Sequence, residues 1–225
     1  MADEKRPNMT EETETAIRLL TEASNELNRE MLIARAEAIQ AYANLEQALC
    51  ALFAYVGGLN KRIAATIFFR ISAFGSRRKI LEELFREKFT GGSVIAFIAS
   101  LTRWLAALEQ ERNEVVHWTV VTQIMGLTVN VRLRPPVFWS RPFDPERGDH
   151  KDSNQLRIFT DKCHFWELAC LKFIDAVNAL SPLDATARAA WLDIFQQQLL
   201  YPLPEDHLLW QMLRAQHNPP QSSPT

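Results

Sequence analysis

The chain has 225 residues, of which 47% are hydrophobic and 23% are charged. This length supports one large domain or a domain with an appended subdomain, and the composition excludes a disordered chain. The net charge is −2, which excludes binding to nucleic acid through an overall positive charge, so any such contact needs a local basic patch.

The three cysteines, Cys50, Cys163 and Cys170, cannot all pair, and none lies in a Cys-x-x-Cys motif. The first seven residues lack the apolar segment of a signal peptide, and apolar runs such as 94–99 are too short to span a bilayer. We therefore expect a soluble, cytoplasmic protein without membrane contact. We expect Cys163 and Cys170 to pack in its core.

The first half of the chain is expected to be helical. From Thr10 to about residue 56, apolar residues recur every three or four positions without a Pro or Gly, which predicts one very long helix or two with a bend. Gly57 and Gly58 end this pattern. Two shorter helices are predicted at 60–72 and 76–89, the second of them capped by Ser76.

The second half alternates between pattern types. β-branched residues at 119–122 and 127–133 around Gly126 predict a β-hairpin. Prolines and Gly148 predict an irregular connector to about residue 154, and a loose tail is expected from His217. Further helices are predicted from about 93 to the hairpin, at 156–180 and at 184–200, with Asp184 as a cap.

Together these patterns predict a mainly α protein. Its expected parts are an N-terminal helical extension (1–30), a helical bundle with a small β-hairpin near 119–134 (31–180), and C-terminal helices with a disordered tail (181–225).

The candidate catalytic residues, Arg112, Asn113 and His117, stand at the end of the helix that precedes the hairpin. The apolar stripe of that helix reaches position 112, so Arg112 occupies a core position and must reach a cleft or be paired. Asn113 and His117 share a helix face. Arg112 and His117 diverge by about 140° on a straight helix, although a long arginine can bend toward the same cleft.

Glu46 interrupts an apolar face of the first long helix in a similar way. A carboxylate in one apolar stripe and a guanidinium in another are natural partners across a helix pair. The hypothesis is therefore that Glu46 orients Arg112.

A basic segment lies between residues 57 and 81, where the chain has no acid. We predict that a polyphosphate backbone lies there, and the alternative is a solvated helix face. The six candidate RNA contacts are Lys61, Arg62, Arg70, Arg77, Arg78 and Lys79.

The block Arg112-Asn113-x-x-x-His117 at the end of a bundle helix resembles the signature of the HEPN-domain family, over roughly residues 30–180. The resemblance implies a HEPN-like helical bundle, a homodimer whose two motifs line one cleft, and a metal-independent endoribonuclease acting as a toxin or in antiviral defence. The chain departs from the family pattern at Trp118, where a small residue often follows the histidine, and in its hairpin.

The implied reaction is attack of an RNA 2′-hydroxyl on its own 3′-phosphate, which leaves a 2′,3′-cyclic phosphate. His117 moves the proton, Arg112 stabilises the phosphate charge, and Asn113 positions His117 or the sugar. No cofactor or metal is expected, since the sequence offers no set of residues at metal-ligand spacing.

Three alternatives stay open. Arg112 and His117 can simply bond neighbouring carboxylates such as Glu111 and Glu114. The chain can be a non-catalytic HEPN-like module that binds nucleic acid or protein. It can also be a toxin silenced by an antitoxin or another regulatory partner that covers or modifies the motif.

Overall fold

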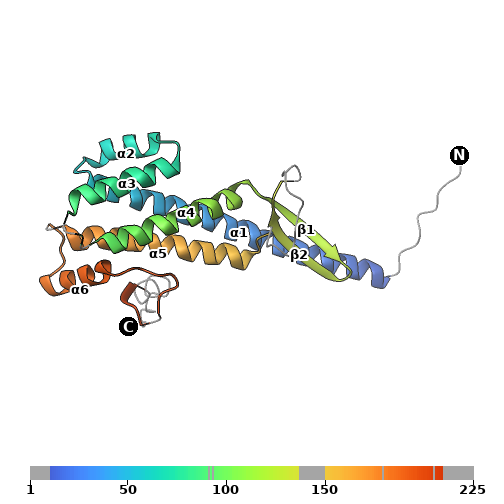
Figure 1. Cartoon of the computed structure of the whole chain (residues 1–225). Helices are drawn as coiled ribbons and strands as arrows, with labels where there is room; N and C mark the ends of the chain where they lie inside the picture. Colours follow the sequence, from blue (N-terminus) through green and yellow to red (C-terminus); the bar gives the residue numbers. More distant parts are fainter. Residues whose placement is uncertain are drawn as a thin grey trace, which may run out of the picture.

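The computed structural model describes residues 11–90, 92, 94–136, 150–178, 180–204 and 206–209. Over these residues the chain forms a helical bundle with a two-stranded hairpin between its helices (Figure 1). The predicted fold class is confirmed. The start of the chain, most of the predicted connector and the predicted tail lie outside the described residues.

Helix α1 (Glu11–Val56) is one continuous helix of 46 residues, about 69 Å long at 1.5 Å per residue. Three glutamates in its first turn suit the positive end of the helix dipole. It ends as predicted, because Gly58 adopts a φ of +61° and lets the amide of Leu59 bond to the carbonyl of Ala54. The predicted boundary at residue 30 falls inside this helix.

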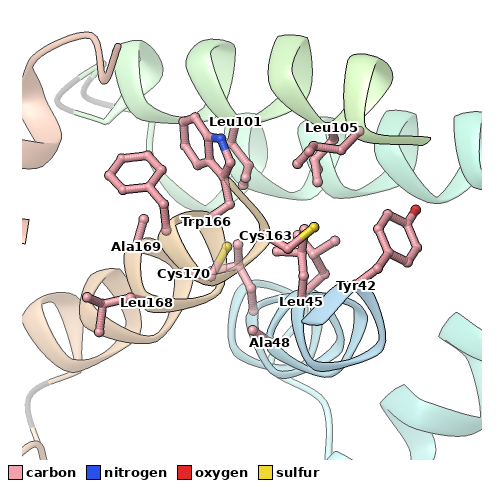
Figure 2. Close-up of a cluster of buried hydrophobic side chains, with 14 of the residues drawn as sticks. Tyr42, Leu45, Ala48, Leu101, Leu105, Cys163, Trp166, Leu168, Ala169 and Cys170 are labelled. Atoms are coloured by element: carbon pink, nitrogen blue, oxygen red, sulfur yellow. The ribbon is translucent and has the colours of Figure 1, made fainter. Parts of the chain in front are cut away.

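The core forms where α5 (Ser153–Val177) runs along α1 and α4 (Ile95–His117) covers the pair. Figure 2 shows side chains from these three helices meeting around Trp166. Cys163 and Cys170 are fully buried there, as predicted. Burial also raises the pKa of both thiols, because a thiolate loses its hydration inside the core.

Helices α2 (Lys61–Arg70) and α3 (Phe74–Lys88) pack near the end of α1 (Figure 1). The side chain of Asn60 caps α2 by accepting from the amide of Arg62. The prediction that Ser76 caps α3 is wrong, since α3 begins two residues earlier. The earlier start places Phe74 in the buried core, with its ring centroid 6.3 Å from that of Tyr42.

Strands β1 (Thr119–Met125) and β2 (Thr128–Arg134) form the predicted hairpin. Gly126 has a φ of +59° and Leu127 does not have a positive φ, which is the combination that a type II′ turn requires. The hairpin lies along the N-terminal half of α1 (Figure 1), where Thr122 and Asn28 exchange hydrogen bonds of 3.0 and 3.1 Å.

The last helices begin at side-chain caps. Asp152 and Gln155 form a capping box at α5, so this helix starts slightly before its predicted limit. Asp184 caps α6 (Ala185–Gln196) as predicted, accepting from the amide of Ala187 at 2.8 Å. None of the described helices is long and apolar enough to cross a membrane.

Candidate active site

The candidate motif occupies the last two turns of α4. Val115 and Trp118 are buried and anchor these turns, and the amide of Trp118 closes the helix on the carbonyl of Glu114 at 2.9 Å. His117 is the last helical residue and is exposed. The motif therefore combines a fixed backbone with solvent-facing polar side chains.

Arg35 of α1 holds the end of α4 in place. Its Nε donates to the carbonyl of Val115 at 2.8 Å, and its Nη2 donates to the carbonyl of Val116 at 2.7 Å. These are C-terminal carbonyls that no helical amide satisfies, and the guanidinium also complements the negative end of the helix dipole. Arg35 thus positions the backbone next to His117.

Arg112 is half-buried and lies toward α1, as its place in the apolar stripe predicts. Its guanidinium carbon lies 5.8 Å from the ring centroid of Tyr42. Its Nη1 donates to Oδ1 of Asn113 at 3.1 Å. This bond fixes the orientation of the Asn113 amide, since the carbonyl oxygen faces the arginine.

Asn113 and His117 are both exposed and line one open groove of about 360 Å³. The other described residues that line it also belong to α4 and are Ala106, Glu109, Gln110 and Glu114. The prediction that Asn113 and His117 share a face is confirmed. Arg112 is not among the described lining residues and connects to the groove through its bond to Asn113.

The acids that flank the motif are paired elsewhere. Glu111 bonds to Lys162 at 2.8 Å, and Glu114 bonds to Lys151 at 2.9 Å. Over the described residues, neither Arg112 nor His117 bonds to these carboxylates. Within the described part of the chain, the motif therefore does not pair with either of these two acids.

The predicted partnership of Glu46 with Arg112 is also wrong. The carboxylate of Glu46 accepts from Nη1 of Arg77 at 2.6 Å, while Nε of the same arginine donates to the carbonyl of Ile71 at 2.7 Å. The guanidinium carbon of Arg77 also lies 5.2 Å from the ring centroid of Phe68. Helix α3 thus brings Arg77 to Glu46, and this pair fastens α3 to α1.

The basic segment divides into two groups. Arg77 is committed to Glu46, and Arg78 donates to the carbonyl of Thr102 at 3.4 Å, so these two cations serve the packing of α3. The contact of Arg78 is also far from the motif, because Thr102 precedes His117 by 15 positions on α4, or roughly 22 Å along the helix. RNA binding by the four exposed cations stays a prediction. They are Lys61, Arg62, Arg70 and Lys79.

The sequence did not predict that the ring of Tyr42 lies next to the Arg112 guanidinium. Burial raises its pKa, and the nearby carboxylates of Glu46 and Glu109 raise it further, while Arg112 lowers it. Its hydroxyl therefore stays protonated at neutral pH, so the ring presents a neutral face to the guanidinium.

The described residues contain no group of three His, Cys, Asp or Glu side chains that could hold a metal ion. Comparisons with protein-family models, with curated proteins and with solved structures found no match to this chain. Function must therefore be inferred from the geometry and chemistry of the site.

Proposed function

We propose that this chain is a HEPN-like, metal-independent endoribonuclease with Arg112, Asn113 and His117 as its catalytic set. The observation that carries the proposal is the open groove at the end of α4. An exposed imidazole and an amide line this groove, and the amide is bonded to a guanidinium. This arrangement offers a proton carrier, a polar donor and a positive charge along one helix end.

His117 acts on the protons of the reaction. It takes the proton from the ribose 2′-hydroxyl as the O2′–P bond forms, and the protonated imidazole gives that proton to the O5′ leaving group as the P–O5′ bond breaks. The products are a 2′,3′-cyclic phosphate and a 5′-hydroxyl. His117 has no hydrogen-bond or ion-pair partner among the described residues, so its ring is available for this role.

Asn113 and Arg112 act on the phosphate. Because Oδ1 of Asn113 accepts from Arg112, its amide NH₂ faces the groove side and can donate to a phosphate or ribose oxygen. The guanidinium has five N–H donors, and the bond to Asn113 uses one of them. The remaining donors supply charge stabilisation as the phosphate becomes more negative.

A second copy of the chain belongs to this proposal. The described lining of the groove comes from α4 alone, and a facing groove from another copy supplies a second wall. In a toxin or antiviral setting, an antitoxin or other regulatory partner would act by covering the same groove.

One observation favours the alternative function, a non-catalytic interaction module. Glu109 and Glu114 line the same groove, and Glu109 has no ion pair within the described part of the chain. Carboxylates repel a phosphodiester and suit a cationic segment of a partner protein.

The test is RNA cleavage in EDTA by the purified protein, with His117→Ala and Arg112→Ala compared with Arg103→Ala. Arg103 is exposed on the same helix and is not among the described residues of the groove, so it controls for loss of a surface side chain. We expect cleavage with cyclic-phosphate ends by the wild type and the control, and loss of at least about 100-fold in the two motif variants.

An RNA analogue with 2′-deoxyribose should be inert, since it lacks the attacking hydroxyl. Cleavage that persists in both motif variants refutes the proposal. Binding of RNA without cleavage by all four proteins identifies the interaction module instead.

A further inference from the structure

The two ends of the molecule expose complementary surfaces. The first surface, called the arm here, consists of residues 11–29 of α1 together with the hairpin turn. Ile124, Met125 and Leu127 at this turn are 56%, 64% and 81% exposed. Thr122 bonds to Asn28, and strands advance about 3.4 Å per residue, so the turn lies roughly 14 Å closer to the start of α1.

The helical part of the arm is acidic. Between residues 11 and 29 it has two arginines, Arg18 and Arg29, both exposed. Against these stand five exposed glutamates, which are Glu11, Glu12, Glu14, Glu22 and Glu26. The arm thus combines an exposed apolar tip with net negative charge.

The second surface is the outer face of α2. Ile63, Ile67 and Phe69 are 54%, 41% and 50% exposed, while Ala64 and Phe68 are buried. At 100° per residue, Ile63 and Ile67 lie on one flank of this outer face and Phe69 lies on the other. The sequence of α2 contains no acid. Its three exposed cations are Lys61, Arg62 and Arg70.

The apolar residues decide between a nucleic acid and a protein as the ligand of this face. A phosphate backbone needs the cations and does not need three large, exposed apolar side chains. A protein partner that is apolar in one part and acidic in another matches both features of α2. The arm has this composition.

The arm and the α2 face of one chain cannot meet. Helix α2 packs at the end of α1, where the ring centroids of Phe53 and Phe68 are 5.7 Å apart, and the arm forms the other end (Figure 1). The continuous helix α1 keeps the two ends tens of ångströms apart. Contact between these surfaces therefore needs two chains.

We propose that the arm of one chain docks on the α2 face of a second copy, with the hairpin turn against the apolar residues and the glutamates near the cations. When two α1 helices run antiparallel, each arm reaches the α2 face of the other chain. The two contacts are then identical and close around a two-fold axis.

This arrangement has a consequence for the groove that rests on the proposed function. Arg35, which holds the end of α4, lies near the middle of α1. In an antiparallel pair the middles of the two α1 helices lie level with each other. The two copies of His117 therefore lie at the same position along the length of the paired α1 helices, which a composite cleft requires.

Association is measured on the full-length protein by sedimentation, independently of RNA cleavage. We expect a dimer at low ionic strength whose dissociation constant rises with salt, because its charges are exposed. Arg62→Glu with Arg70→Glu should raise that constant about tenfold or more, and Glu12→Lys with Glu22→Lys should do the same. Arg103→Glu, an exposed charge outside both surfaces, is the matched control.

The decisive experiment combines the two reversed pairs. A chain that carries both pairs should dimerise again. An equimolar mixture of the two singly reversed proteins should form heterodimers, since a reversed arm meets a reversed α2 face. Leu127→Ser should weaken the dimer without changing its salt dependence, whereas Leu180→Ser, which removes a side chain that is 92% exposed elsewhere, should not weaken it.

A protein that is monomeric at low salt, or a failure of the double reversal to restore the dimer, overturns the proposal. Loss of RNA binding without any change in association upon reversal of Arg62 and Arg70 also overturns it and assigns the α2 face to RNA. A dimer that forms as expected but cleaves no RNA leaves the docking intact and counts against the proposed function alone.

Discussion

Replacement of Arg35 by methionine tests whether a residue outside the motif controls it. Methionine keeps much of the apolar stem of arginine and removes both hydrogen bonds to the carbonyls of Val115 and Val116. The change also removes a positive charge from the C-terminal end of α4. The first consequence is a loss of stability, and the second is a less fixed position of His117.

The size of the stability loss follows from these contacts. A hydrogen bond to a charged group contributes about 1.5–3 kcal/mol, and water replaces part of that at a half-buried site. For two such bonds we expect a loss of about 3 kcal/mol. In a protein of this length that loss lowers Tm by roughly 6–12 °C. Arg35→Lys keeps the charge but cannot make both bonds in the same geometry, so it should lose about half as much.

Thermal melting and RNA cleavage at 25 °C, where the variant is still folded, measure the two consequences separately. We expect cleavage per folded molecule to fall at least about tenfold, since small displacements of a catalytic group have large effects on rate. A Tm within about 1 °C of the wild type would show that the carbonyl contacts do not stabilise the fold. Lower stability with unchanged cleavage would show that Arg35 does not position His117.

Three further changes have expected outcomes. Glu46→Gln should lower the free energy of unfolding, measured with urea, by about 1–2 kcal/mol because Arg77 loses its charged partner, and cleavage per folded molecule should not change. Gly126→Ala should lower the free energy of unfolding, measured by thermal melting, by about 1 kcal/mol, because alanine is strained at the positive φ of this position. The added methyl group meets no atom within 4 Å, so a steric clash does not add to this loss. A higher Tm would contradict this expectation. Cys163 and Cys170 should resist iodoacetamide at pH 8 until the protein unfolds, because burial raises the pKa of both thiols; rapid native labelling by mass spectrometry would disprove their burial.

Local chemistry made most of the fold predictable from the sequence. Periodic apolar residues without Pro or Gly predicted α1, and paired glycines predicted its end. Gly126 between two β-branched runs predicted the hairpin and its turn, and Asp184 predicted the start of α6. In each case residues that are near in the sequence determine the structure.

The errors concern choices between distant partners. The position of Glu46 in an apolar stripe showed that it needs a cation, but several arginines were available, and the packing of α3 decided for Arg77. Arg35 gave no signal because its partners are backbone carbonyls, which every residue has. Ser76 has a good capping side chain, yet burial of Phe74 set the start of α3.

The charge around the groove links the proposed reaction to the proposed dimer. Lys151 neutralises Glu114, which leaves the negative charge of Glu109 against the positive charge of Arg112. A single chain therefore offers a phosphodiester almost no net attraction at the motif. In the proposed dimer each facing motif brings one guanidinium and one Glu109 carboxylate, so pairing adds no net positive charge, and the attraction for a phosphate depends on the guanidinium groups lying closer to it than the carboxylates do. On the proposed function, pairing therefore contributes by placing two guanidinium groups at one phosphate rather than by changing the net charge of the cleft.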